Sequence, residues 1–336
     1  MRWELPRAFL LSLVFIFVIE LFVCTFFSRF ATNPTYAKLG AKIKIARREG
    51  LNQDLLILGD STSAASLNAE ALQKNTGLST FNFSLIDNAT YAGYYFVLQD
   101  YLRSNRPPRY IILMNAYKVW GLDYSGGKSK LLMMIFPERT LDLLSHPEFT
   151  DCPGDILKNI VKWLLPSQRY KYEIRRLLES RNFLEYLRVA FHKEKELTEE
   201  VLRQKGTSFF QEAPLVANLR EQRKFVKNTP FRITRLNDYY LNKFLNETRE
   251  KNIKVFICFP PLLKEFYEEE KDTEYFRSYK LFMEKIVSSH SHTLFLTDDF
   301  YPVLIEELSN AIYHVNTKGQ DNFTRMISQR ILELIQ

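Results

Sequence analysis

The sequence predicts an α/β protein with a parallel sheet and helices on both faces, and three observations lead to this. Short apolar runs at residues 55–58, 110–114 and 254–259 are typical of strands that are buried on both faces. Segments with apolar residues at helical spacing lie between them, and such alternation of strand and helix is the pattern of a parallel sheet. The 336 residues, 46% of them hydrophobic, exclude a disordered chain and allow one large domain.

The first strand leads into a turn that carries a possible nucleophile. Gly59 breaks the apolar run, and Asp60, Ser61 and Thr62 favour the start of a helix, which we expect to continue through Leu72. Ser61 is therefore expected on the turn between strand and helix. In an open α/β sheet this turn faces the crevice at the carboxyl ends of the strands, so a serine there can act as a nucleophile.

The remaining elements follow in order along the chain. We expect a helix at 91–102, one at 235–251, one at 273–288 and a last one from Thr317, with strands at 80–85, 110–114, 254–259 and 293–296. Residues 120–230 interrupt this order and predict a helical insertion. The insertion is either a lid, partner surface or membrane-facing patch, or a plain helical elaboration of the core.

The N-terminal region predicts a membrane anchor. Residues 9–27 are almost entirely apolar and, at about 1.5 Å per helical residue, would cover roughly 28 Å, close to the thickness of a bilayer core. A cleaved signal peptide and a buried core helix are the alternatives. Glu20 inside this stretch is expected to find a protein partner, or else to snorkel or be protonated. The predicted organisation is an anchor at 1–30, a linker or entry helix at 31–53 and an α/β domain at 54–336.

Charge and metal-ligand patterns restrict the partners. The net charge of +7 is scattered, which suits a membrane surface or an acidic polymer, and no basic-aromatic module indicates nucleic acid. The basic residues after the apolar stretch favour a cytoplasmic domain, although long domains cross membranes regardless of charge.

His290 and His292 have no third metal ligand nearby, so we expect neither a metal nor a cofactor. The three cysteines indicate no disulfide framework.

Three residues provide the parts that nucleophilic acyl chemistry needs. That chemistry requires a hydroxyl at an exposed turn, an imidazole within hydrogen-bond reach and donors that face the developing oxyanion. Ser61 supplies the hydroxyl and a backbone N–H, and Asn115 ends a neighbouring strand with a side-chain donor. Of the five histidines, His314 alone lies just before the last amphipathic helix.

Two motifs near the ends of this region resemble a known superfamily. Gly59-Asp60-Ser61 after a buried strand, with residues 313–316 and Gly319 near the C-terminus, resembles the SGNH (GDSL-type) hydrolases. Within it, the membrane-anchored members similar to the D-alanine transfer protein of teichoic acid modification and to alginate O-acetylation proteins look closest. The resemblance implies a single-pass protein of the bacterial cell membrane with an extracytoplasmic domain. It also implies a membrane-bound O-acyltransferase as partner and an envelope polysaccharide or polymer as substrate.

The resemblance assigns roles to individual residues. Ser61 matches the nucleophile, His314 the base and Asn115 the oxyanion asparagine, although Leu113 stands where the usual glycine precedes that asparagine. The glycine of a second oxyanion motif would fall near residue 87 or 88, and neither position is a glycine.

The acid of the triad is the main departure from this pattern. The family's aspartate, three residues before the histidine, falls on Ala311, and Asn310 precedes it, so no carboxylate orients His314. Asp298 or Asp299 could substitute in space. Otherwise the site is a slow dyad or is inert.

These observations predict acyl ester hydrolysis or O-acyl transfer on an envelope polymer through Ser61 and His314. The alternative from another class is a catalytically inert scaffold that binds the polymer or the acyltransferase. A third reading is a plain lipid or carbohydrate esterase that works without a partner.

Overall fold

The computed structural model describes residues 7–27, 34–85, 89–121, 195–210 and 218–335, with scattered positions between 136 and 184. The chain divides into two compact units. One consists of Met1–Ala41 and Tyr124–Glu199, and the other of Lys42–Asp123 and Glu200–Gln336. The predicted insertion at 120–230 falls largely outside the described residues.

In the first unit, helix α1 (Arg7–Phe27) occupies the segment predicted to span a membrane, and that prediction was wrong. Among the helices of the described residues, none combines the length and apolar character needed to cross a bilayer. Glu20 interrupts the apolar run, and its carboxylate accepts hydrogen bonds from the backbone N–H of Ser167, at 2.7 Å, and from the Ser167 hydroxyl. Large apolar side chains of α1, among them Phe15 and Phe17, are exposed. The single-pass membrane location and the extracytoplasmic domain depended on this span and are corrected with it.

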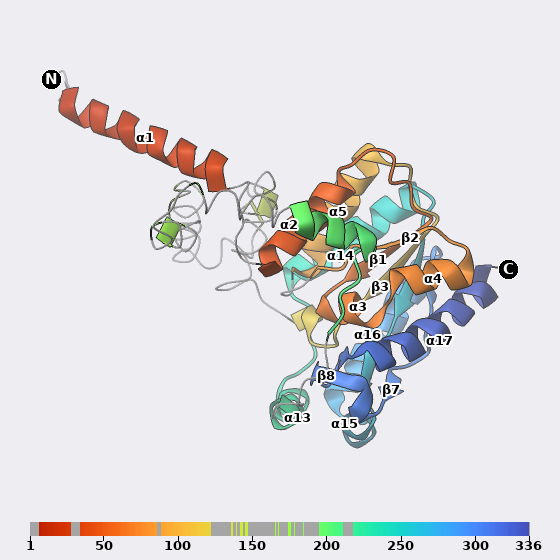
Figure 1. Ribbon diagram of the computed structural model, residues 1–336. Coiled ribbons are helices and arrows are strands. Elements are labelled where there is room, and N and C mark those ends of the chain that lie inside the picture. Colours follow the sequence, from red (N-terminus) through yellow and green to blue (C-terminus); the bar gives the residue numbers. More distant parts are fainter. Residues whose placement is uncertain are drawn as a thin grey trace. The chain divides into compact units, whose positions relative to one another are not determined.

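The second unit is built on a five-stranded parallel sheet with the strand order β2-β1-β3-β4-β6 (Figure 1). In register, Ile57 of β1 lies opposite Ile112 of β3, which lies opposite Phe256 of β4. The central strands β1 and β3 are buried along their whole length, as continuous apolar runs require. The strands are β1 (Leu55–Gly59), β2 (Thr80–Asn82), β3 (Tyr110–Met114), β4 (Lys254–Cys258) and β6 (Thr293–Phe295).

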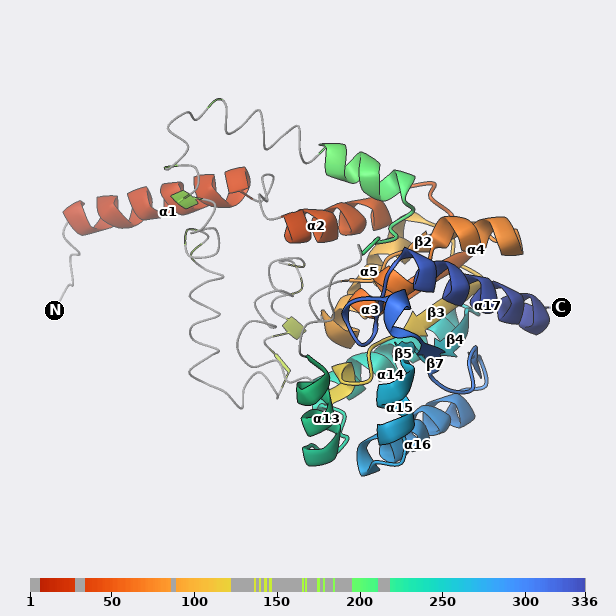
Figure 2. The same ribbon diagram turned by 60° about the horizontal axis from the view of Figure 1, so that its bottom comes forward.

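Helices cover both faces of this sheet. On one face, alternate strand residues such as Ile57 and Ile112 form a core with α4 (Ala69–Thr76) and the C-terminal helix α17 (Thr317–Ile335). These two helices, one orange and one blue, run side by side in both Figure 1 and Figure 2. On the other face, α5 (Thr90–Ser104) packs on β1 and on α14 (Arg235–Glu250), which contacts β4.

Shorter elements extend the sheet unit at the carboxyl ends of its strands. β5 (Pro261–Leu263) pairs in parallel with β7 (Tyr301–Val303), and β8 (Leu308–Ala311) forms an antiparallel hairpin with β9 (His314–Val315). The remaining elements are α2 (Pro34–Ala46), η1 (Val119–Gly121), α13 (Asn218–Asn228), α15 (Lys264–Glu270), α16 (Glu274–Ser289) and η3 (Ile305–Glu307).

Two expected elements are divided or shortened in the structure, and the strands β5, β7, β8 and β9 and the helix α15 were not expected. The single helix expected from Ser61 to Leu72 is two helices, α3 (Ser61–Ser66) and α4, because Asn68 caps a new helix by accepting hydrogen bonds from the N–H groups of Glu70 and Ala71. The strand expected at 80–85 ends at Asn82. Asn316 precedes α17 and accepts a hydrogen bond from the Gly319 N–H at 3.2 Å.

Candidate functional site

Ser61 is the first residue of α3 and is separated from the end of β1 by Asp60 alone. The turn requires glycine at position 59, since a Cβ there would lie 1.8 Å from the Met114 carbonyl oxygen. This close approach lets β1 end against β3 and turn immediately into α3. At the first position of a helix, the Ser61 N–H has no partner within the helix, and a backbone N–H in this position can bind an oxyanion.

Asp60 fixes the turn that carries Ser61. Its buried carboxylate accepts hydrogen bonds from the N–H of Thr62, at 2.9 Å, and from the N–H of Ala116 in the loop after β3, at 3.1 Å. Burial raises the pKa of Asp60 to about 6, although these hydrogen bonds favour its charged form. Asp60 therefore acts as an N-cap that joins the ends of two neighbouring strands.

The β8–β9 hairpin brings His314 to Ser61. The Ser61 Oγ and the His314 Nε2 are 3.0 Å apart, and both side chains are partly buried. On the other side of the ring, His314 Nδ1 lies 2.9 Å from the Asn310 Oδ1. Because an amide oxygen only accepts hydrogen bonds, this contact assigns the proton to Nδ1 and leaves Nε2 as the acceptor for the serine hydroxyl. This is the tautomer that a general base needs.

Asn310 is the residue of the candidate site whose place behind the imidazole the sequence did not predict. Ala311, the position expected to hold the acid, pairs in register with His314 through the backbone, whereas Asn310 reaches the ring from the next position of β8. The two aspartates considered as substitutes for the triad acid make other contacts. Asp298 pairs with Arg330 at 3.9 Å, and Asp299 pairs with Lys280 at 2.7 Å. A polar residue four positions before the histidine was the available signal.

Two aromatic rings enclose the imidazole. Phe210 stacks on His314, with ring centroids 5.1 Å apart and planes at 3°. Tyr313 meets the same ring edge-on, with centroids 4.9 Å apart. Burial, and secondarily the positive charge of Lys118, lower the pKa of His314 to about 4. At neutral pH the imidazole is therefore uncharged and able to accept a proton.

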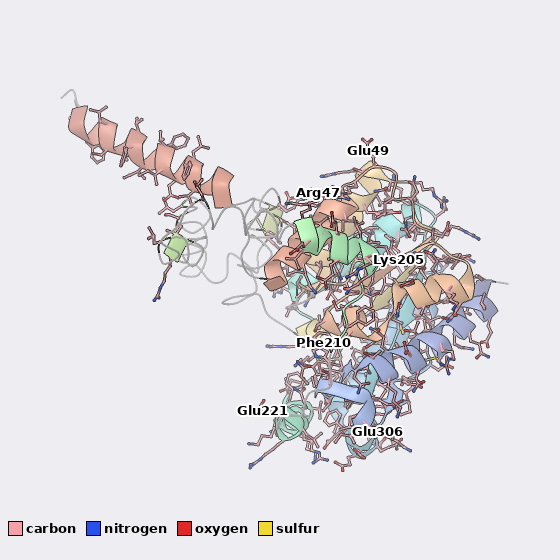
Figure 3. All side chains as sticks on the ribbon, in the orientation of Figure 1. Arg47, Glu49, Lys205, Phe210, Glu221 and Glu306 are labelled. Carbon is pink, nitrogen blue, oxygen red and sulfur yellow. The ribbon has the colours of Figure 1, made fainter. Side chains whose placement is uncertain are left out.

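Phe210 is the last residue of a segment, here called the cover segment (residues 205–210), that the core holds in place. Figure 3 labels both ends of it, Lys205 and Phe210. The Lys205 carbonyl accepts a hydrogen bond from the Asn82 N–H at 2.8 Å. Gly206 has φ +75°, and a Cβ there would lie 2.0 Å from the Asn82 carbonyl oxygen. The segment therefore lies against the end of β2.

Gln320 of α17 ties the cover segment to the nucleophile helix. Its amide Nε2 donates to the carbonyl oxygen of Ala65 in α3 and, at 3.1 Å, to that of Ser208. The Ser208 N–H in turn donates to the Ala64 carbonyl at 2.9 Å. One buried side chain thus joins three segments that are far apart in the sequence.

Asn115 lies after β3 as expected, but no described hydrogen bond joins it to Ser61 or His314. Its Nδ2 donates to the buried hydroxyl of Tyr91 at 2.7 Å, and its buried Oδ1 has no partner among the described residues. Rotating the amide by 180° would let the Tyr91 hydroxyl donate to Oδ1 and would free both Nδ2 hydrogens. The residues near 87 and 88, where a second oxyanion donor was sought, lie outside the described residues.

Metal ligands do not converge in the described part of the chain, where no three His, Cys, Asp or Glu side chains could hold an ion. His290 Nδ1 contacts the Ile286 carbonyl oxygen at 2.9 Å, and His292 Nε2 contacts the Thr248 hydroxyl at 3.0 Å. Both rings therefore make local contacts.

The fold and the Ser61–His314 pair define an α/β protein with a serine–histidine arrangement at the carboxyl edge of a parallel sheet. The structure is similar to the crystal structure of a putative acylhydrolase from Bacteroides fragilis, at 9% sequence identity and a TM-score of 0.39. The match covers 91% of this chain and 98% of that one. No protein-family model and no curated protein matches the sequence.

Proposed function

We propose that this protein is a serine acyl hydrolase in which Ser61, His314 and Asn310 form the catalytic triad. The observation that carries the proposal is the 3.0 Å contact between Ser61 Oγ and His314 Nε2, with Asn310 oriented behind the ring. A histidine held by an asparagine is a known variant of nucleophile–base catalysis. Ser61 and His314 are separated by 253 residues in sequence, so a chance local contact does not explain their pairing.

In the proposed reaction, the Ser61 oxygen attacks the carbonyl carbon of an acyl ester while its proton passes to His314 Nε2. The negative charge that develops on the carbonyl oxygen is held by the Ser61 N–H, with the Asn115 amide as the second donor. The tetrahedral intermediate collapses, the C–O bond to the alcohol breaks, and His314 returns the proton to the departing oxygen. Water then repeats the sequence on the acyl-serine and releases the acid.

The neutral amide of Asn310 has a consequence for the rate. It orients the imidazole and fixes its tautomer, but it offers no negative charge to stabilise the imidazolium that forms in the transition state. We therefore propose a slower catalyst than one with an aspartate in this place.

The finer identity of the substrate follows from the resemblance alone. The motifs resemble those of envelope-modifying proteins, which supports an O-acyl group on a polysaccharide or polymer as the substrate. A polymer hydroxyl in place of water would make the same acyl-serine the intermediate of a transferase, with a membrane-bound O-acyltransferase as the proposed source of acyl groups. Transfer of the acetyl group from an aryl acetate to a hydroxyl of an added methyl glycoside, with release of the phenol, would identify the transferase reaction.

Labelling with a fluorophosphonate tests the hydrolase directly. We expect an adduct on Ser61, located by peptide mass spectrometry, and hydrolysis of aryl acetates that Ser61→Ala lowers by at least ~10³-fold. Ser288→Ala, an exposed serine on α16, is the control and keeps full activity. If Ser61→Ala hydrolyses esters at the wild-type rate, Ser61 is not the nucleophile. If the wild type hydrolyses no ester and the probe labels no serine, the inert scaffold is the correct reading.

A further inference from the structure

Lys118 lies beside the candidate site, between the end of β3 and η1. Its Nζ is 4.8 Å from the centre of the Tyr313 ring, a cation–π contact that holds the ammonium group in place. The Tyr313 ring is in turn 4.9 Å from the His314 ring. The sum of these two distances places the ammonium within about 10 Å of the imidazole, and its positive charge contributes to the lowered pKa of His314.

The charge of Lys118 is not balanced by the described part of the protein. Some lysines of this unit face carboxylates, as Lys227 faces Glu270 at 3.1 Å and Lys280 faces Asp299 at 2.7 Å, whereas Lys243 lies over tyrosine rings as Lys118 does. Within the described residues, Lys118 makes no ion pair and its side chain is partly exposed. No described carboxylate therefore neutralises this cation.

Among the described residues, no carboxylate contacts Ser61 or His314. The position behind the imidazole, where a triad holds a carboxylate, is the neutral amide of Asn310. The nearest acidic group in the sequence, Asp60, directs both carboxylate oxygens to backbone N–H groups and is almost completely buried. The site thus has one cation and no exposed carboxylate among these groups.

We propose that Lys118 is a specificity residue that binds an anionic group, a carboxylate or a phosphate, carried by the ester substrate close to its acyl group. The inference rests on the proposed function and names its substrate class. An anion facing Lys118 gains a Coulombic partner at a partly exposed position. It also offsets the positive charge that opposes protonation of His314, so the substrate supplies part of the negative charge that Asn310 lacks.

Matched esters test this inference. We would compare 4-acetoxybenzoate and 4-acetoxyphenyl phosphate with the neutral methyl 4-acetoxybenzoate, in wild type, Lys118→Met and Lys118→Arg. Lys254→Met is the control, because Lys254 is exposed and is the first residue of β4. It therefore lies at the amino ends of the parallel strands, opposite the carboxyl ends that carry the candidate site. We expect a preference of about tenfold in kcat/KM for an anionic ester, which Lys118→Met removes and Lys118→Arg and Lys254→Met keep. The two anions distinguish carboxylate from phosphate recognition.

Equal kcat/KM values for the anionic and neutral esters in the wild type would overturn the inference, as would an equal loss on both esters in Lys118→Met. Binding decides the question if no ester is hydrolysed and the proposed function fails. In a Ser61→Ala background, titration calorimetry should show at least fivefold weaker binding of the anionic esters after Lys118→Met, with binding of the neutral ester unchanged. Equal affinities for anionic and neutral esters in that background would overturn the inference independently of catalysis.

Discussion

The side-chain oxygen of Asn310 lies 2.9 Å from Nδ1 of His314, across the hairpin of β8 and β9. This contact gives the imidazole a fixed orientation and a fixed tautomer without a charge behind it. The arrangement separates two effects that an aspartate combines, namely positioning and electrostatic stabilisation.

Substitution of Asn310 should separate these effects. Asn310→Asp keeps the acceptor and adds a negative charge, so we expect a higher kcat and an acid limb of the pH–rate profile that moves to higher pH, because the carboxylate raises the pKa of His314. Asn310→Ala removes the acceptor, and we expect kcat to fall by about 10- to 100-fold. Steady-state hydrolysis of an aryl acetate between pH 4 and 9 measures both. If Asn310→Ala leaves kcat unchanged, Asn310 does not orient the ring.

Protonation of His314 should also appear in the folding stability. Its pKa is about 4 in the folded state, against an ordinary value near 6.5, so between these pH values the unfolded chain binds more protons and stability rises with pH. Asp60 acts in the opposite direction, because its pKa is raised to about 6 and the folded state gains protons as the pH falls. Urea denaturation of wild type and His314→Gln at pH 4.5 and 7.5 isolates the contribution of His314 protonation to the free energy of unfolding. We expect the wild type to lose more stability on acidification than the variant, and an equal loss would contradict the low pKa.

The cover segment makes a prediction about the ring that it places over His314. Phe210→Leu removes the stacked ring and exposes the imidazole, so its pKa should rise and the acid limb of the rate profile should move to higher pH, with kcat reduced severalfold. Phe209→Leu is the matched control, since Phe209 is 46% exposed. Chemical-shift titration of the His314 ring protons measures the pKa without relying on catalysis. A Phe210→Leu variant that titrates as the wild type does would show that the ring does not shield the imidazole.

Asn115 is expected to act in the transition state through its amide. Asn115→Ala should lower kcat by about 10²-fold or more with little change in KM. Tyr91→Phe frees the amide to rotate, so we expect a smaller fall in kcat, together with a loss of about 1 kcal/mol in stability. Tyr101→Phe loses a comparable hydrogen bond, which the Tyr101 hydroxyl accepts from the Gln53 N–H before β1, and should affect stability alone. An unchanged kcat in Asn115→Ala would leave the oxyanion to other donors.

The turn before Ser61 should tolerate no side chain at position 59. Gly59→Ala places a Cβ 1.8 Å from the Met114 carbonyl oxygen, and we expect about 2–4 kcal/mol of lost stability with loss of activity. Gly40→Ala in α2 is the control, because its Cβ would meet nothing within 4 Å. Thermal unfolding of the two variants compares them, and equal stability of Gly59→Ala and wild type would contradict the close approach of β1 and β3.

Long apolar runs made the sheet predictable from the sequence. The strands at 55–59, 110–114 and 254–258 appear where their continuous hydrophobicity indicated, since burial on both faces leaves no polar alternation. The hairpin of β8 and β9 could not be recognised from the sequence, because strands of two to four residues are too short to show an alternation of apolar and polar residues. Its register is what brings Asn310 to the histidine, so the acceptor behind the ring depends on pairing that the sequence does not display.

Two other differences have local causes. The break between α3 and α4 depends on one side chain, Asn68, that competes with the helix for backbone N–H groups. The membrane helix was inferred from hydropathy over residues 9–27, and the same stretch contains Glu20, whose carboxylate is hydrogen-bonded to Ser167. Counting apolar residues did not account for this polar contact.

The hydrogen bonds of Gln320 affect when the site can exist during synthesis. A ribosome releases Ser61 early, whereas the imidazole at position 314 and the amide at position 320 follow more than 250 residues later. Until that last stretch docks against α3, Ser61 has no imidazole beside it, and the cover segment lacks its hydrogen bond to Gln320. A growing chain would therefore carry an unreactive hydroxyl, and reactivity would begin only when the C-terminal helix takes its place.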